Sequence, residues 1–572
     1  QFFEKHAKLL KELEILVLDE IHEYRGFFGV NMALLLRRFL AKLESVGVRP
    51  QVVLATATCA NAREHAWRLT GRDCELVSSG AVMRPERKFY FVEPMIPDHQ
   101  YSEIIQVRLA NTALACLEGK LSTLVFCPTR RFAEEAAEKS RIEAERLGRE
   151  DAHAIVAYRS GIAAQERRQI EDGLRDGSVR VAFTTNALEI GIDIGKLDCC
   201  VLVGFPDNIM SAWQRIGRTG RDWKKLAHVV YFALNNPHDK FFANNLEAFL
   251  DKPLDEILIG LDNQEVMRRH FPFSCYELGG DFESKAAECL GSPFLQYCRD
   301  RIQGTRLSRT RPPYLNLEIR GSSGPVYKLK LGETEIGEIS ELHRFREAYI
   351  GAVYIHAGRR YVVDAHGASD VYLVPATDQT RTEGSFHTVI SEDDFAPMAG
   401  RAWPGDVEAM YGDVTIWENF TGYRQIDVKS GSVLGEWDGS ASLNRRARGL
   451  WLSLKAPECL EALSPDGTLS GLAQLLVIGT PFVLSCDRHD FTVHVRSSGQ
   501  RAEVILYETV AGGIGIAEKA VEVWPDILRV GMQIARRCRC LNGCPGCVEP
   551  AWRRVGKGSA KKKPTLRDAE IV

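Results

Sequence analysis

The stretch LEILVLDEIH at residues 13–22 decides the fold, because its short apolar run ends on two adjacent acids, Asp19 and Glu20. Similar apolar runs recur further along the chain, and amphipathic stretches separate them; the runs lie at residues 52–55, 123–126, 179–183, 199–203 and 229–233. Strands that alternate with helices in this way are typical of doubly wound parallel sheets. Ligands bind beyond the carboxyl ends of such strands, so the polar residues after each run are the candidate site.

The chain has 572 residues. This is too many for one hydrophobic core, since single cores stop growing near ~250–300 residues. A proline-bearing stretch and later changes in pattern predict five units: residues 1–95 and 96–254 as two α/β units, 255–310 as a helical or winged connector, 311–402 as a small β-rich domain, and 403–572 as a mixed α+β domain with clustered cysteines and a basic tail.

The 76 acidic and 73 basic residues nearly cancel, so a nucleic-acid partner would have to be held by local basic patches. No run of eighteen apolar residues occurs, which predicts no membrane span. Most of the fifteen cysteines stand singly, unlike the framework of a secreted disulfide protein. We therefore expect a cytoplasmic protein.

The first candidate site follows the opening strand. Asp19 and Glu20 suit a pair in which one carboxylate holds Mg²⁺ and the other positions or deprotonates a water, with His22 beside them. A turn at a helix N-terminus is the plainer alternative. After the next strand come three small residues that could couple this site to a neighbouring domain, or could be an ordinary strand end: Thr56, Ala57 and Thr58.

Two later segments carry candidate phosphate and sugar contacts. FTTNALEIGIDIG at residues 183–195 offers the hydroxyls of Thr184 and Thr185 to a nucleic-acid phosphate and the carboxylate of Asp193 to a ribose hydroxyl. WQRIGRTGR at residues 213–221 places three arginines at three-residue spacing. These guanidinium groups repel one another, which favours a polyanion or phosphoryl partner; a solvated helix face is the alternative for this segment. For residues 183–195, the alternative is an ordinary strand-to-helix junction.

Four cysteines lie within ten residues, in the pattern C-x-C-x₃-C-x₂-C: Cys538, Cys540, Cys544 and Cys547. Four thiolates at this spacing favour a tetrahedral zinc site that stabilises a small lobe; an iron–sulfur cluster, free thiols or a redox pair are the alternatives. In the nearby SCDRHD, we expect Asp487, His489 and Asp490 to hydrogen-bond within their own domain.

In this order, DEIH, TAT, TTNALEIGIDIG and QRIGRTGR resemble motifs II, III, V and VI of superfamily 2 helicases. Longer stretches narrow the resemblance to the branch typified by mitomycin repair factor A and its RecQ-four-like relatives: DEIHEYRGFFGVNMALLLRRF, YETVAGGIGIAEK and CRCLNGCPGC. The resemblance implies two tandem RecA-like α/β domains with parallel sheets, followed by the connector, the β-rich domain and a zinc-binding domain.

The resemblance also implies an ATP-dependent DNA helicase that moves 3′ to 5′ in DNA repair, uses ATP, Mg²⁺ and Zn²⁺, and acts on single-stranded and duplex DNA at the nucleoid. It assigns ATP chemistry to Asp19, Glu20, His22, Gln214, Arg218 and Arg221, with the last two as arginine fingers. It assigns nucleotide contacts to Gly191, Asp193 and Arg215, strand contacts to Thr129, Arg130, Thr184 and Thr185, and coupling to Thr56, Ala57 and Thr58. An RNA helicase and an ATPase-deficient DNA-binding scaffold are the competing interpretations.

One motif of the family is missing from the sequence. No Gly-x-x-x-x-Gly-Lys-Ser/Thr occurs. Such a P-loop cradles the β- and γ-phosphates with backbone N–H groups and a lysine. We therefore expect the chain to be a fragment of a longer motor protein.

Overall fold

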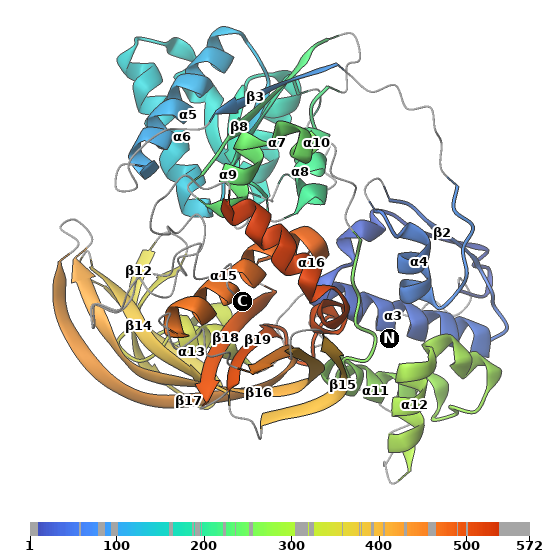
Figure 1. The fold of residues 1–572 in the computed structure, drawn as a ribbon. Helices are drawn as coiled ribbons and strands as arrows, with labels where there is room; N and C mark the ends of the chain where they lie inside the picture. The colour runs from blue at the N-terminus through green and yellow to red at the C-terminus, as the bar shows by residue number, and fades with distance from the viewer. Residues whose placement is uncertain are drawn as a thin grey trace.

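The computed structural model describes residues 10–536 except for these gaps: 57–58, 78–85, 93–100, 159–163, 186–187, 189–194, 196, 207, 221–224, 235, 251–255, 304–318, 320–324, 357–358, 377, 379, 391–393, 404–406, 428–431, 456–464, 485, 489 and 499–500. Four β-sheets form the described part of the chain, and helices pack on them (Figure 1).

The N-terminal unit, residues 10–77, is built on two parallel strands, β1 (Ile15–Leu18) and β2 (Gln51–Leu54). A 3₁₀ turn and two helices complete it: η1 (Ile21–Glu23), α3 (Gly26–Ser45) and α4 (Ala62–Thr70). Leu34 and Leu40 of α3 are fully buried, whereas Ile15 and Val17 of β1 are 54% and 61% exposed. One face of the two-stranded sheet is therefore open to solvent.

The second α/β domain, residues 86–250, holds a six-stranded sheet in the order β3-β8-β7-β4-β6-β5, with every neighbouring pair parallel. Its strands are β3 (Arg87–Val92), β4 (Thr123–Phe126), β5 (Ile155–Tyr158), β6 (Val181–Thr184), β7 (Cys199–Val203) and β8 (Ala227–Phe232). One face packs against α5 (Tyr101–Glu118) and α6 (Arg130–Arg146), with η3 (Glu150–Ala154) at its edge. The other face packs against four helices: α7 (Ala164–Asp176), α8 (Ile209–Ile216), α9 (Pro237–Asn244) and α10 (Leu246–Leu250). Because helices cover both faces, the central strands are apolar throughout.

The helical connector, residues 256–303, packs against α3 of the N-terminal unit. It consists of α11 (Gln264–Leu278), η5 (Lys285–Leu290) and α12 (Ser292–Ile302). Arg38 of α3 donates hydrogen bonds to Glu277 and, at 3.0 Å, to Nδ1 of the buried His270. A buried charge is stable only when it is paired, so this network fixes the connector to the N-terminal unit.

Two further sheets follow. The small β domain, residues 326–375, has the strand order β10-β9-β13-β12-β11. Its elements are β9 (Val326–Leu331), β10 (Thr334–Ser340), α13 (Glu341–Glu347), β11 (Val353–His356), β12 (Arg359–His366) and β13 (Asp370–Pro375). The C-terminal domain, residues 380–536, has the order β14-β16-β17-β19-β18, with β15 added on β16. Its elements are β14 (Thr380–Val389), β15 (Phe395–Trp403), β16 (Val407–Asp427), β17 (Val433–Lys455), α15 (Pro465–Leu484), β18 (Phe491–Ser498), β19 (Arg501–Glu508) and α16 (Ile516–Arg536).

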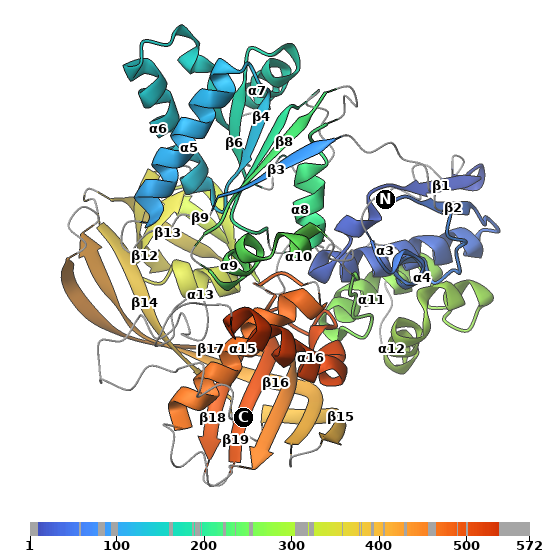
Figure 2. The ribbon, with the colours of Figure 1, turned by 45° about the horizontal axis from the view of Figure 1, so that its top comes forward.

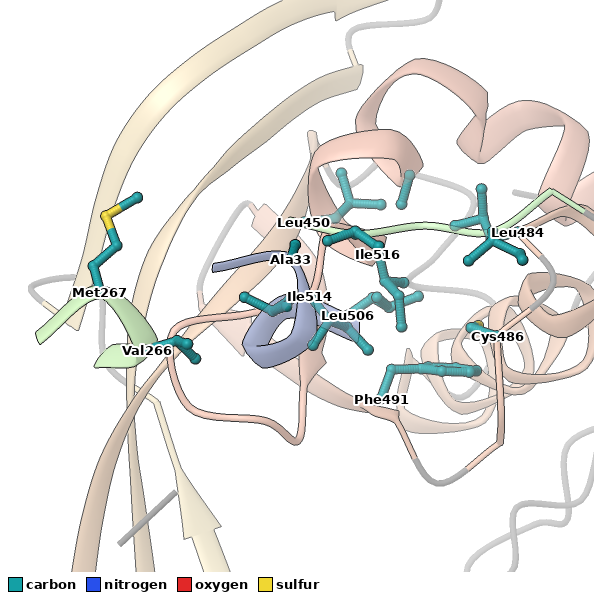
Figure 3. Close-up of a cluster of buried hydrophobic side chains, with 14 of the residues drawn as sticks. Ala33, Val266, Met267, Leu450, Leu484, Cys486, Phe491, Leu506, Ile514 and Ile516 are labelled. Atoms are coloured by element: carbon teal, nitrogen blue, oxygen red, sulfur yellow. The ribbon is translucent and has the colours of Figure 1, made fainter. Parts of the chain in front are cut away.

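Helices α15 and α16 lie side by side over the C-terminal sheet (Figure 2). Two glycines allow the close approach: a methyl group at Gly479 would overlap the carbonyl oxygen of Ile527, and one at Gly531 would overlap that of Leu475. The core beneath is shared between domains. Figure 3 shows Ala33 of α3 and Val266 of α11 beside Leu450, Leu506 and Ile514 of the C-terminal domain.

The predicted α/β class with parallel sheets is confirmed, but two strand pairings cross the expected domain boundaries. Strand β3 pairs with β8, so the second α/β domain begins before Arg87 rather than at residue 96. Strands β14 and β15 pair with β16, so the last domain begins near Thr380 rather than at residue 403. Both errors arise because alternation identifies a strand but does not identify the strand with which it pairs.

Candidate functional site

The predicted acidic site lies where β1 and β2 end together. Asp19 and Glu20 follow β1, and Thr56 follows its parallel neighbour β2, in which Leu54 is in register with Leu18. His22 lies between the two strand ends, with Nδ1 3.2 Å from the Thr56 hydroxyl oxygen. The structure therefore brings together four of the predicted residues. Ala57 and Thr58 lie outside the described residues.

Glu20 has an unusual backbone. Its φ of 52° and ψ of 45° place it in the left-handed region, one of two such non-glycine residues in the described part of the chain. This conformation costs on the order of 1–3 kcal/mol and tends to occur at functional sites. The Glu20 backbone N–H donates to Asp19 Oδ1 at 2.9 Å, and the Glu20 side chain is 45% exposed. The Glu20 carboxylate is therefore accessible; residues 19–23 are called the acidic turn from here on.

His22 is almost fully buried, and burial lowers its pKa despite the raising influence of Glu20 and Glu23. Its Nδ1 lies 3.4 Å from Glu20 Oε2, and its Nε2 lies 3.5 Å from Glu23 Oε1. A neutral imidazole has one donor and one acceptor nitrogen. It can therefore link the acidic turn to Thr56 without adding a fixed charge.

His65 supports the same turn, although no sequence pattern marks it. This α4 residue is fully buried, and its Nε2–H donates to the Ile21 carbonyl oxygen at 2.8 Å. Its Nδ1 has no hydrogen-bond partner, and burial lowers its pKa to about 4. A lone histidine 43 positions after His22 carries no recognisable spacing, so only the fold associates it with the site.

Helix α8 brings the predicted arginine segment to the N-terminal unit, which it faces in Figure 2. Gln214 Nε2 donates to Glu23 Oε1 at 3.3 Å, so this residue reaches the acidic turn. Arg215 instead lies with its guanidinium 5.3 Å from the ring centre of Phe126, inside its own domain. Arg218 is half-buried just beyond the helix. Gly191, Asp193 and Arg221 lie outside the described residues.

The predicted strand-binding threonines lie at neighbouring strand ends of the second α/β domain. Thr184 ends β6 and, with Thr185, is buried; the Thr184 hydroxyl donates to the Thr185 carbonyl at 3.2 Å. Thr129 follows β4 and is exposed, and its hydroxyl caps α6 by accepting from the Phe132 N–H at 3.1 Å. The side chain of Arg130 is outside the described part.

Asp487 makes hydrogen bonds both within its own domain and beyond it. Within its domain, the Asp487 backbone N–H donates to Asp490 Oδ2 at 3.1 Å. Its carboxylate, however, accepts from Asn208 of the second α/β domain at 3.0 Å and lies 3.6 Å from Arg25 of the N-terminal unit. The predicted hydrogen bonding inside the domain is present, and Asp487 also contacts two other domains, which the sequence did not predict.

Cys538, Cys540, Cys544 and Cys547 lie outside the described residues. Among the described residues, no group of three or more histidine, cysteine or acidic side chains could hold a metal ion. None of the helices among the described residues is long and apolar enough to cross a membrane.

Comparison with known proteins agrees with this geometry. The Helicase conserved C-terminal domain family matches residues 107–222, and the MrfA Zn-binding domain family matches residues 472–548. The Bacillus subtilis protein named uncharacterized ATP-dependent helicase YprA is 28% identical over 576 residues, which cover 95% of this chain and 74% of the relative.

The Schizosaccharomyces pombe ATP-dependent helicase hrq1 is 24% identical over 94% of this chain. The chain spans about half the length of this relative and of its Saccharomyces cerevisiae counterpart. A crystal structure of the DUF1998 helicase MrfA bound to DNA superposes with a TM-score of 0.68 at 25% identity, over 96% of this chain and 76% of that one.

The parallel sheets and the two family matches are similar to those of superfamily 2 helicases. Among these, the chain is similar over most of its length to the ATP-dependent helicase YprA and to the DUF1998 helicase MrfA, and it matches the MrfA zinc-binding domain as well as the helicase C-terminal domain.

Proposed function

We propose that this chain forms part of an ATP-driven DNA translocase that moves 3′ to 5′ in DNA repair, working at the nucleoid. The observation that carries the proposal is the Gln214–Glu23 hydrogen bond of 3.3 Å, which joins the helix of the second α/β domain to the acidic turn of the first. A motor that converts hydrolysis into movement needs such a link across its two halves.

The residues at the acidic turn fit a magnesium nucleotide. Asp19 and Glu20 offer hard oxygen donors at the open end of a parallel sheet, where ligands bind. Asp19 would hold Mg²⁺, which neutralises phosphate charge, and Glu20 would orient and deprotonate the attacking water. His22 and Thr56 would couple the turn to the second domain, and Arg218 and Arg221 would stabilise the γ-phosphate.

Strand binding is assigned to the second α/β domain. Thr129, Arg130, Thr184 and Thr185 lie at the carboxyl ends of β4 and β6, which pair in parallel. Hydroxyl, guanidinium and backbone N–H groups there suit a phosphate backbone. The DNA-bound state of the MrfA relative supports DNA over RNA as the partner. Gly191, Asp193 and Arg215 are proposed to contact the nucleotide.

The test is ATP hydrolysis by this chain and by a form extended upstream to include a P-loop, each with no nucleic acid, with single-stranded DNA and with RNA. We expect turnover in the extended form, stimulated by DNA. Stimulation by RNA alone would favour an RNA helicase. An inactive extended form that still binds DNA would favour a scaffold without ATPase activity.

A further inference from the structure

The C-terminal domain and the N-terminal unit behave as one body because they share a core. Ile514 and Ile516 pack in the same buried cluster as Ala33 of α3 and Val266 of α11 (Figure 3). Backbone contacts reinforce this core: the Gly260 N–H donates to the Ile514 carbonyl at 2.9 Å. Contacts of this size and apolar character resist separation.

The second α/β domain contacts this body through fewer elements than join the N-terminal unit to the C-terminal domain. Phe482 of α15 inserts among aromatic side chains, with its ring 4.9 Å from that of His238 and 5.3 Å from that of Phe242. His238 Nε2–H donates to the Ile478 carbonyl at 3.0 Å. Beside this aromatic contact, α9 contacts α16, Met210 of α8 is buried in the shared core, and α8 also presents several polar side chains.

Those polar contacts recur every three residues, so they share one face of the helix end. Asn208 Nδ2 donates to Asp487 Oδ1 at 3.0 Å, Ser211 Oγ accepts from Arg25 at 3.5 Å, and Gln214 donates to Glu23. Asp487 also lies 3.6 Å from Arg25. One carboxylate of the C-terminal domain therefore contacts both halves of the motor.

A cavity of about 240 Å³ lies at this junction. Its lining includes Arg25 and Phe27 of the N-terminal unit, Met210 of α8, and Leu484 and Asp487 of the C-terminal domain. Close-packed cores resist sliding, whereas a void between domains leaves room for small displacements. The polar contacts around it therefore carry much of the alignment between α8 and the acidic turn.

We propose that Asp487 is a positioning residue of the motor: by holding Asn208 and Arg25 together, it sets the spacing between α8 and the acidic turn. The inference rests on the proposed function for its catalytic consequence, but its structural content is independent of ATP. Hydrogen bonds to a charged group are worth more than neutral ones, while the Asp487 and Arg25 side chains are partly exposed at 35% and 28%. Such a contact can hold α8 at one distance from the acidic turn and can still break during a cycle of ATP hydrolysis.

The decisive variant is Asn208→Asp. Asn208 also caps α8, because its Oδ1 accepts from the Ser211 N–H at 2.8 Å. Aspartate is an equally good cap, so the helix is preserved, but the donor facing Asp487 becomes a second carboxylate. The double variant Asn208→Asp/Asp487→Asn exchanges donor and acceptor and should restore the hydrogen bond. Gln533→Glu, at an exposed position of α16, is the control for the gain of one acidic charge.

The first measurement is the distance between probes at Ser45 and Glu145, which are exposed residues in the N-terminal unit and the second α/β domain. The probes are attached through non-natural amino acids, since the chain has fifteen cysteines. Without nucleotide, we expect one narrow distance in the unmodified chain and in the control. In Asn208→Asp, a second population at other distances should appear. The ratio of molecules at the original distance to molecules at other distances should fall by about tenfold. The double variant should recover it.

An unchanged distance distribution in Asn208→Asp, or a double variant no better than the single one, would overturn the proposal. Both outcomes can be measured in a chain that hydrolyses no ATP. They can therefore be distinguished from a failure of the proposed function. In the extended form, Asn208→Asp should lower kcat while leaving KM for ATP within twofold, because Asp487 does not lie at the acidic turn. A raised KM with normal kcat would also contradict the positioning role.

Discussion

At the scale of the residue, the acidic turn is a strained backbone that presents two accessible carboxylates, those of Asp19 and Glu20. Glu20 holds a left-handed conformation immediately after Asp19. If Glu20 deprotonates the attacking water, Glu20→Gln in the extended form should lower DNA-stimulated ATP turnover by about 10²–10⁴-fold. The amide keeps the shape of the side chain, so DNA affinity should stay unchanged. Glu12→Gln, at an exposed position before β1, is the matched control, and normal turnover in Glu20→Gln would remove the assigned role.

His65 makes the stability of the same turn depend on pH. The unfolded imidazole takes up a proton near pH 6.5, whereas burial lowers the pKa in the folded chain to about 4. The unfolded state therefore binds more protons between these values, and the free energy of unfolding should fall by up to about 3 kcal/mol as pH drops from 6.5 to 4. Urea titrations at several pH values measure this. His65→Gln should flatten the dependence; an equally steep one would show that other groups cause it.

The candidates that the sequence marks differ in one physical respect from His65, which it does not mark, and from Asp487, whose contact with another domain it does not predict. Asp19, Glu20 and Thr56 follow directly on apolar strands, and parallel strands bring such positions to one edge, so local pattern is enough. His65 and Asp487 act through contacts with residues 44 and 279 positions away, Ile21 and Asn208. No local period encodes such a distance. Their roles become visible only when the helices and domains are packed.

At the scale of the element, the packing of α15 on α16 depends on two small side chains. Gly479→Val should force the helices apart because its side chain would overlap the Ile527 carbonyl. Overpacking of a tight contact costs about 1–3 kcal/mol, which denaturant unfolding would detect. Gly479→Ala should cost less. Gln533→Ala, on the exposed side of α16, should change the free energy of unfolding little. An equal loss of stability in Gly479→Val and Gln533→Ala would refute the packing argument.

The cysteine segment is a second element with its own expected behaviour. The family match over residues 472–548 includes all four thiols and supports zinc. We expect about one Zn²⁺ per chain, and Cys544→Ser should reduce it, because a structural site needs four ligands. Elemental analysis measures the metal, and Cys74→Ser, a cysteine elsewhere in the chain, is the control. Iron with inorganic sulfide in place of zinc would mark an iron–sulfur cluster.

At the scale of the whole molecule, the domains divide into one large body and one attached domain. Sequence alternation predicted the parallel sheets correctly, but it placed β14 and β15 in the wrong domain, because all-β segments on either side have the same period. Only pairing across the chain shows that the C-terminal sheet begins at Thr380. The consequence is mechanical: the shared core joins the C-terminal domain to the N-terminal unit, and the second α/β domain is held mainly by α8 and Phe482.

This division predicts that Phe482→Ala uncouples the second α/β domain from the rest. The substitution removes a ring stacked on His238 and Phe242, and truncating a core phenylalanine to alanine costs about 3–5 kcal/mol, an upper bound for the partly buried Phe482. Because that energy lies between domains rather than within one, calorimetry should show the single unfolding transition separating into two. Phe395→Ala deletes a comparable ring, 4.9 Å from Trp451 within the C-terminal sheet. It should lower the melting temperature of that domain without separating the transitions. Identical profiles for the two variants would mean that Phe482 stabilises its own helix and does not join the domains.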